Sequence, residues 1–147
     1  MDVYEHRLIK VDSPRDMDQR QEFFINKAAQ VAYRSPCLHQ HGAVIVNRNT
    51  DEILATGYNK MEMHYEHMFS LHAEVDAIRK VKKHVDLTNA EMYVVRIGPP
   101  CQPLKMSRPC TECEKFILKR GIGKVYYSWG DCIDYGDKKF TNFKEKK

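Results

Sequence analysis

The sequence predicts an α/β fold in which helices pack on a mixed β-sheet. The chain has 147 residues, of which 42% are hydrophobic and 30% charged, and this composition is typical of one globular domain. Its periodicities predict the order helix, hairpin, helix, strand, helix, strand. Because a helix joins the last two strands, we expect those strands to be parallel.

The first half of the chain contains a helix and a hairpin. Apolar residues recur at helical spacing between Asp16 and Tyr33, between two Ser-Pro pairs that mark the helix ends. Two short apolar runs follow, Gly42 to Asn47 and Glu52 to Tyr58, joined by the turn-rich residues 48–51. This pattern predicts an antiparallel hairpin. The next residues, Asn59 to Leu71, are expected to form a long loop.

The second half alternates helices with strands. Apolar residues at helical spacing predict a helix from His72 to about Lys83, and a run rich in β-branched residues predicts a strand over Met92 to Ile97. A further helix is expected over Thr111 to Arg120, ended by Gly121, and then a strand over Lys124 to Ser128.

The charge distribution separates a neutral body from a basic tail. The net charge of +4 resides in residues 138–147, which contain five Lys and one Glu, so residues 1–137 are neutral and form the predicted single domain. The tail is either solvated or a phosphate contact. Because the body of the domain is neutral, a nucleic-acid partner is possible but not favoured. No apolar stretch approaches the roughly 20 residues of a membrane span, and the first ten residues are charged. We expect a cytoplasmic protein without a membrane contact.

Two short motifs place metal-ligating residues at predicted helix starts. His72 and Glu74 open the second helix, and Cys110 and Cys113, one helical turn apart, open the third. One His and two Cys are three zinc ligands, and three protein ligands leave the fourth position open for water, as in a catalytic site. A structural zinc or a redox pair remains the alternative for the two cysteines. The helix start is expected to favour the thiolate form of both.

Glu74 is the predicted proton carrier. Residues two apart on a helix point in different directions, so Glu74 is not expected to join His72 as a ligand. Zinc lowers the pKa of a water molecule toward 7, and a nearby carboxylate can then move its proton to a ring nitrogen and to a departing amine. A His-x-Glu motif with a Pro-Cys-x-x-Cys motif is the described signature of zinc deaminases. The alternative is that Glu74 has only a structural role, as a carboxylate that interacts favourably with the helix dipole at the helix start.

These motifs and their surroundings resemble the cytidine and deoxycytidylate deaminase superfamily, and most closely its deoxycytidylate branch. The similar segments are Tyr33 to Cys37, Gly42 to Val46, Thr56 to Asn59, His72 to Ile78, Arg108 to Cys113 and Gly121 to Tyr126. The resemblance implies a three-layer α-β-α sandwich with a mixed five-stranded sheet, a catalytic Zn²⁺ and a homo-oligomer. It also implies that Asn59 contacts the sugar hydroxyl and that the backbone at Ala73 contacts the base.

The resemblance implies hydrolytic deamination of a cytosine nucleotide or nucleoside, with dCMP to dUMP favoured. The alternatives are a deaminase of bases in RNA or single-stranded DNA, and a zinc-stabilised binding module. Two positions depart from the branch: Lys60, where Gly is usual, and Asp76, where Asn is common. Cys37, His39 and His41 have a metal-like spacing, but a buried thiol and surface imidazoles explain them as well.

Within the segment Arg96 to Arg108, the stretch from Gly98 to Ser107 is longer than in the enzymes that the chain resembles, and it carries three prolines. Prolines restrict the backbone, so this segment can present cations at a small ordering cost. We hypothesise that Lys105 or Arg108 contacts a substrate phosphate; the alternative is a solvated basic loop.

Overall fold

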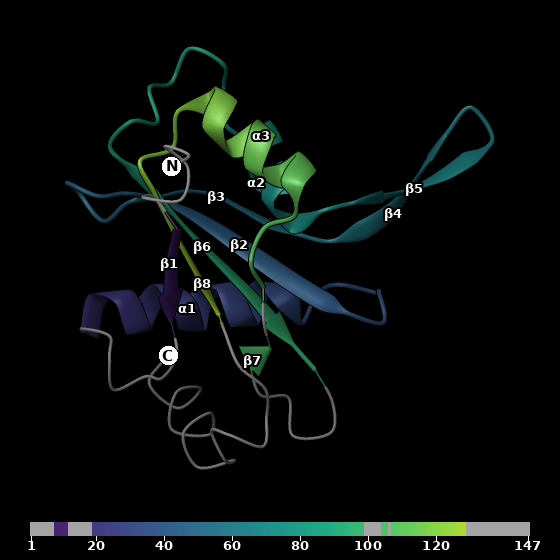
Figure 1. The fold of residues 1–147 in the computed structure, drawn as a ribbon, viewed down its shortest axis with the longest axis horizontal. Helices are drawn as coiled ribbons and strands as arrows, with labels where there is room; N and C mark the ends of the chain where they lie inside the picture. Colours follow the sequence, from purple (N-terminus) through teal and green to yellow (C-terminus); the bar gives the residue numbers. More distant parts are fainter. Residues whose placement is uncertain (1–7, 12–18, 99–103, 106, 129–147) are drawn as a thin grey trace.

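A computed structural model describes residues 8–11, 19–98, 104–105 and 107–128 of the chain (Figure 1). Its elements are β1 (Leu8–Val11), α1 (Gln19–Ala32), β2 (Gln40–Asn47), β3 (Ile53–Tyr58), β4 (Lys60–His64), β5 (His67–Leu71), α2 (Ala73–Arg79), β6 (Ala90–Ile97), β7 (Leu104–Lys105), α3 (Thr111–Arg120) and β8 (Lys124–Ser128). The basic tail, residues 138–147, lies outside the described residues. None of the described helices is long and apolar enough to cross a membrane.

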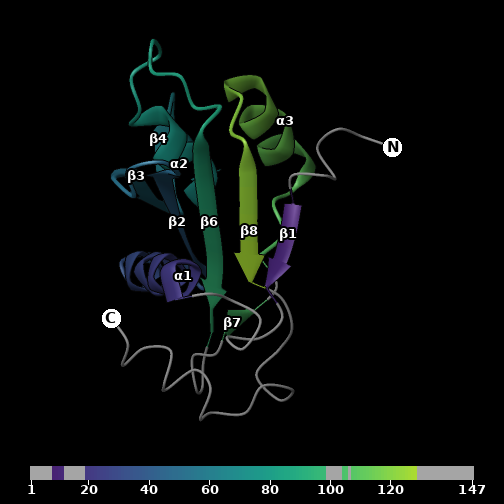
Figure 2. The same cartoon turned by 90° about the vertical axis from the view of Figure 1, so that its left-hand side faces the viewer.

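The central sheet is mixed, with the strand order β1-β8-β6-β2-β3 and with β7 paired to β6. β6, β8 and β1 run in the same direction, side by side (Figure 2). β2 is antiparallel to both β3 and β6. The predicted hairpin and the predicted parallel pair are therefore confirmed. The sheet has six strands instead of five, because the two-residue β7 folds back onto the end of β6.

Helices cover both faces of the sheet, which confirms the three-layer α/β sandwich. α1 lies on one side of the strands, and α2 and α3 lie on the other (Figure 1). On β2, Val44 and Val46 pack into the cluster that contains α1, whereas Ala43 and Ile45 pack into the cluster that contains α2 and α3. A strand buried on both faces reads as a continuous apolar run, which explains the sequence of β2.

Two glycines allow the helices to approach the sheet closely. A Cβ atom at Gly42 would lie 2.1 Å from the carbonyl oxygen of Ala28 in α1. A Cβ atom at Gly57 would lie 2.4 Å from the backbone nitrogen of Ala77 in α2. Only glycine fits at these positions, and Gly57 therefore fixes the height of α2 above the sheet.

The predicted helix boundaries are mostly confirmed. α3 has the predicted bounds, and Gly121 ends it with φ of 79°, a left-handed conformation that suits glycine. α1 ends one residue before the predicted Tyr33. α2 is shorter than predicted, because the chain leaves the helix at Lys80 instead of continuing to Lys83.

The predicted loop over Asn59 to Leu71 is wrong: these residues form the hairpin β4–β5, which projects from the body (Figure 1). Tyr65 and Glu66 form its two-residue turn, both with positive φ, as a type I′ turn requires. Neither residue is the usual Gly or Asn of such turns, so the sequence carried no turn signal. Met61 and Met63 alternate with polar residues along β4, which leaves one face of the hairpin rich in methionine.

Candidate metal and substrate site

Three ligand atoms converge above the sheet: the Nδ1 atom of His72 and the Sγ atoms of Cys110 and Cys113. All three lie within 4.8 Å of one another. Nδ1 of His72 is 3.1 Å from Sγ of Cys113 and 3.5 Å from Sγ of Cys110. The structure therefore brings the three predicted metal ligands together, from two helices that are far apart in the sequence.

The starts of α2 and α3 position these ligands. His72 is the N-cap of α2 and Cys110 is the N-cap of α3, and both have extended backbone conformations. Cys113 lies in the first turn of α3 and is buried. Because α2 and α3 pack side by side on the same face of the sheet, their first turns present all three side chains to one point.

The donor set fits zinc. A tetrahedral zinc with Zn–N near 2.0 to 2.1 Å and Zn–S near 2.3 Å spaces its nitrogen and sulfur ligands about 3.6 Å apart. The two nitrogen–sulfur distances of 3.1 and 3.5 Å are close to that spacing. Among the described residues, this is the one group of three His, Cys, Asp or Glu side chains with metal-binding geometry.

The helix start was expected to favour the thiolate form of Cys113, but in the protein without a metal ion the thiol form is favoured. Burial, the neighbouring Glu74 and Cys110 together raise the pKa of the Cys113 thiol far above its ordinary value. The thiol is almost fully removed from solvent, and burial disfavours the charged thiolate. A bound cation is the partner that reverses this preference, which agrees with a metal site.

Glu74 lies beside the ligands, in the first turn of α2, with 5% of its surface exposed. Burial raises the pKa of its carboxyl group above the usual range; hydrogen bonding to its own backbone and the neighbouring His72 and Cys113 oppose this shift. Burial thus moves the carboxyl pKa upward, toward the range in which one group can both accept and return a proton.

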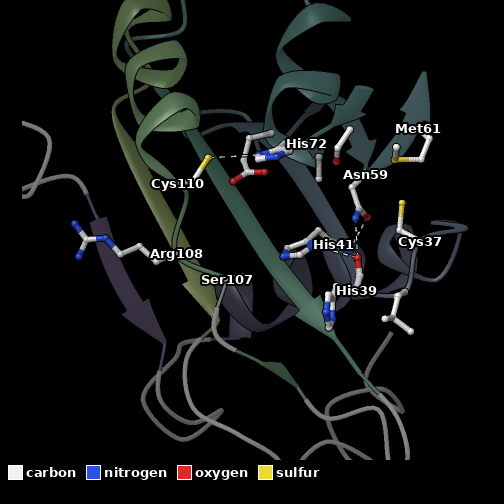
Figure 3. A pocket seen from close by; sticks show the side chains of 13 residues that line it. Cys37, His39, His41, Asn59, Met61, His72, Ser107, Arg108 and Cys110 are labelled. Atoms are coloured by element: carbon white, nitrogen blue, oxygen red, sulfur yellow. Dashed lines mark hydrogen bonds between the residues drawn. The ribbon is translucent and has the colours of Figure 1, made fainter. Parts of the chain in front are cut away.

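A pocket of about 470 Å³ opens above this group and includes Glu74 in its lining. It is also lined by Cys37, Leu38, His39, His41, Asn59, Met61, Ser70, His72, Ala73, Ser107, Arg108 and Cys110. Cys110 and His72 lie at one end of the pocket and His39 at the other, with His41 and Asn59 between them (Figure 3). Met61 and Ser70, which pair across the β4–β5 hairpin, add a wall that was not predicted.

Asn59 and Ala73 both line the pocket, as the predicted substrate contacts require. The side chain of Asn59 is fixed by the backbone: its Oδ1 accepts a hydrogen bond from the N–H of His41 at 2.8 Å, and its Nδ2 donates to the carbonyl of His39 at 2.6 Å. Asn59 therefore holds the chain segment before β2 against the pocket.

Lys105 and Arg108 are placed differently from each other. Arg108 belongs to the pocket lining, but its side chain extends away from His41 and Asn59 (Figure 3). Its Nη2 lies 3.5 Å from Oε1 of Glu114. The backbone of Lys105 pairs with Arg96 in the sheet. Their predicted contact with a phosphate stays a prediction.

His39 and His41 belong to the pocket, and neither joins a metal-like cluster within the described part of the chain. Nδ1 of His41 donates to the carbonyl of His39 at 3.3 Å. The pKa of His41 is lowered to about 4, chiefly by burial; the hydrogen bond to the backbone of His39 opposes this shift, and the nearby Arg96 and His72 add to it. His41 is therefore neutral near pH 7. The sequence did not reveal that His39 and His41 line the pocket, because their position depends on how β2 pairs with β6.

The two departures noted in the sequence, Lys60 and Asp76, contact each other. Nζ of Lys60 lies 3.1 Å from Oδ2 of the buried Asp76. The same oxygen accepts a hydrogen bond from the backbone N–H of Tyr58 and forms an ion pair with Lys80. This pairing ties the base of β4 to α2 immediately beside Asn59.

Comparisons with known proteins agree with this geometry. Residues 18–129 match the family described as the cytidine and deoxycytidylate deaminase zinc-binding region. The chain is similar to the crystal structure of dCMP deaminase from the cyanophage S-TIM5 in complex with dCMP and dUMP, with 26% identity, a TM-score of 0.54, and coverage of 80% of this chain and 90% of that chain.

Two bacterial cytidine deaminases share the fold. The Burkholderia pseudomallei enzyme is 16% identical, with a TM-score of 0.53 and coverage of 71% of this chain and 78% of that chain. A mutant Mycobacterium tuberculosis enzyme is 16% identical, with a TM-score of 0.52 and coverage of 75% and 85%. No relative was found among curated protein sequences. Since the family match spans most of the chain and contains the three ligands, the chain belongs to the cytidine and deoxycytidylate deaminase family of zinc-dependent hydrolases.

Proposed function

We propose that the chain catalyses the hydrolytic deamination of a cytosine nucleotide, with dCMP as substrate and dUMP as product. The observation that carries this proposal is the buried carboxyl of Glu74 beside the ligand atoms of His72, Cys110 and Cys113, in a pocket of about 470 Å³. The similarity to a dCMP deaminase in complex with dCMP and dUMP supports the choice of substrate.

His72, Cys110 and Cys113 would hold Zn²⁺, which lowers the pKa of a water molecule toward 7 when it is bound. In the reaction, water adds to C4 of the cytosine ring, and the C4–N bond to the exocyclic amine then breaks to release ammonia. Glu74 accepts the proton of the attacking water and delivers it to the ring nitrogen N3. It then takes the proton of the new C4 hydroxyl and carries it to the departing amine, so that C4 becomes a carbonyl as ammonia leaves.

The remaining predicted contacts orient the substrate. In this proposal the backbone at Ala73, at the start of α2 next to Glu74, contacts the base. Asn59 contacts a sugar hydroxyl in this proposal, using the donor and acceptor capacity that its two hydrogen bonds to the backbone leave free. Both residues belong to the same pocket as the metal ligands, which supports these roles.

A substrate panel tests the proposal. Zinc-loaded protein is incubated with dCMP, CMP, deoxycytidine, cytidine and a short cytosine-containing single strand, and the release of ammonia is measured. We expect the highest kcat/KM with dCMP. The highest activity on the single strand would instead support a polynucleotide deaminase, and zinc binding without any activity would support a binding module. Sedimentation of the same sample tests the expected homo-oligomer.

A further inference from the structure

We infer that His39 is the phosphate contact of the pocket, held in place by Arg96, and that the two residues make the enzyme selective for a nucleotide monophosphate over a nucleoside. His39 lines the pocket, whereas Arg96 contacts the His39 ring from outside the lining. This inference rests on the proposed function, because it concerns how the same pocket distinguishes its substrates. It assigns the phosphate contact to a pair of residues that the sequence pattern did not connect.

The strand register brings the two residues together. His39 precedes β2, and in the β2–β6 pairing the neighbouring His41 lies opposite Arg96. Nη2 of Arg96 lies 2.8 Å from Nδ1 of His39. A guanidinium group only donates hydrogen bonds, so Nδ1 of His39 is the acceptor. In neutral His39, Nε2 must then carry the ring proton, and this N–H is the type of donor that a phosphate oxygen accepts.

The segment that carries His39 is held in place before any substrate binds. Its carbonyl accepts hydrogen bonds from Nδ2 of Asn59 at 2.6 Å and from Nδ1 of His41 at 3.3 Å (Figure 3). Arg96 fixes the ring at its other end. A donor that is already ordered loses little conformational entropy on binding, which favours a specific contact.

The charge at this end of the pocket suits an anion. Arg96 forms no ion pair with a carboxylate among the described residues, and its buried Nε has no hydrogen-bond partner there. Glu74 is the single acidic residue of the pocket lining, and it lies beside the metal ligands. A dianionic phosphate near His39 would therefore meet the guanidinium charge of Arg96 without an opposing carboxylate in the lining.

The position along the pocket also suits a phosphate. The metal ligands lie at one end of the pocket, Asn59 and His41 lie in the middle, and His39 lies at the far end (Figure 3). A nucleotide has the same order of parts, with the base at one end, the sugar in the middle and the phosphate at the other. Arg108, in contrast, extends away from the middle of the pocket and pairs with Glu114.

The test measures kcat/KM for dCMP and for deoxycytidine in Arg96→Ala and His39→Ala, and the binding of dUMP and deoxyuridine by calorimetry. We expect a loss of about 10- to 100-fold for dCMP turnover and dUMP binding, the range of a lost hydrogen bond to a charged group. Deoxycytidine turnover and deoxyuridine binding should not change. His39→Gln, whose amide also donates, should recover part of the dCMP activity.

Two further comparisons sharpen the result. Arg48→Ala is the matched control, because it removes the same charge from the exposed residue after the other end of β2, and it should leave both substrates unaffected. The double variant Arg96→Ala/His39→Ala should lose less than the product of the two single losses, because Arg96 acts partly through His39.

The outcomes separate this inference from the proposed function. If the unsubstituted enzyme prefers dCMP but both variants keep its dCMP-to-deoxycytidine ratio, the inference is wrong and the proposed function stands. Equal losses on both substrates would show a structural role and also overturn the inference, as would a selective loss in Arg108→Ala or Lys105→Ala alone. If the unsubstituted enzyme uses deoxycytidine as well as dCMP, the proposed nucleotide substrate itself is wrong.

Discussion

Replacing Gly57 by Ala should move α2, the helix that carries Glu74, away from the sheet. The added Cβ atom would lie 2.4 Å from the backbone nitrogen of Ala77 and 2.5 Å from the carbonyl oxygen of Ala73. Carbon atoms pack best at about 3.5 to 4.0 Å, so α2 must retreat by about 1 Å. These contacts are backbone atoms and cannot rotate aside. Overpacking of this kind costs about 1 to 3 kcal/mol of folding free energy.

The same displacement should reduce catalysis, because α2 carries Glu74 and begins after His72. A misplacement of about 1 Å at a reacting group can cost roughly 10²-fold in rate. Gly42→Ala is the matched control: it creates a comparable overlap on the opposite face, with α1, which carries none of the metal ligands.

Urea unfolding, zinc content and kcat for dCMP should be measured for both glycine variants. We expect both to lose stability, and only Gly57→Ala to lose a large part of its kcat per bound zinc. An unchanged kcat in folded Gly57→Ala, or an equal loss in Gly42→Ala, would refute this reasoning.

Two further substitutions test the metal group and its support. Cys113→Ser should lose zinc, measured by atomic absorption, and lower the melting temperature, because a hydroxyl is a weaker zinc ligand than a thiolate; full zinc retention would contradict the assignment. Asp76→Asn should keep the hydrogen bond from Tyr58 but remove both lysine ion pairs. We expect it to lose about 1 kcal/mol of stability in urea unfolding at low salt and less at high salt, and a loss that ignores salt would count against the ion pairs.

The sequence predicted the parts of the fold that have a strong local signal. The apolar runs of β2 and β3 and the turn-rich residues between them identified their hairpin, and Gly121 marked the end of α3. The hairpin β4–β5 was missed because its turn residues, Tyr65 and Glu66, are not residues that signal a turn in the sequence. The pairing of Met61 with Ser70 across β4 and β5 could therefore be seen only in the structure.

The candidate site also contains residues that the sequence could predict and residues that it could not. His72, Cys110 and Cys113 could be predicted because zinc requires particular residue types at particular helix positions, and these leave a readable spacing. The pocket roles of His39 and His41 could not, because they depend on which residue of β6 lies opposite them, and strand register is a property of the whole sheet.

The most direct test of the proposed mechanism is Glu74→Gln. The substitution keeps the size of the side chain and removes its capacity to accept and return a proton. Zinc content, dUMP binding and dCMP turnover should be measured on the same preparation. If Glu74 is the proton carrier, the variant should hold one zinc per chain and bind dUMP unchanged. Its kcat should fall by roughly 10²- to 10⁴-fold, the range of general acid–base catalysis. Loss of the metal would make Glu74 a ligand, and undiminished turnover would remove it from the mechanism; either result would contradict the account.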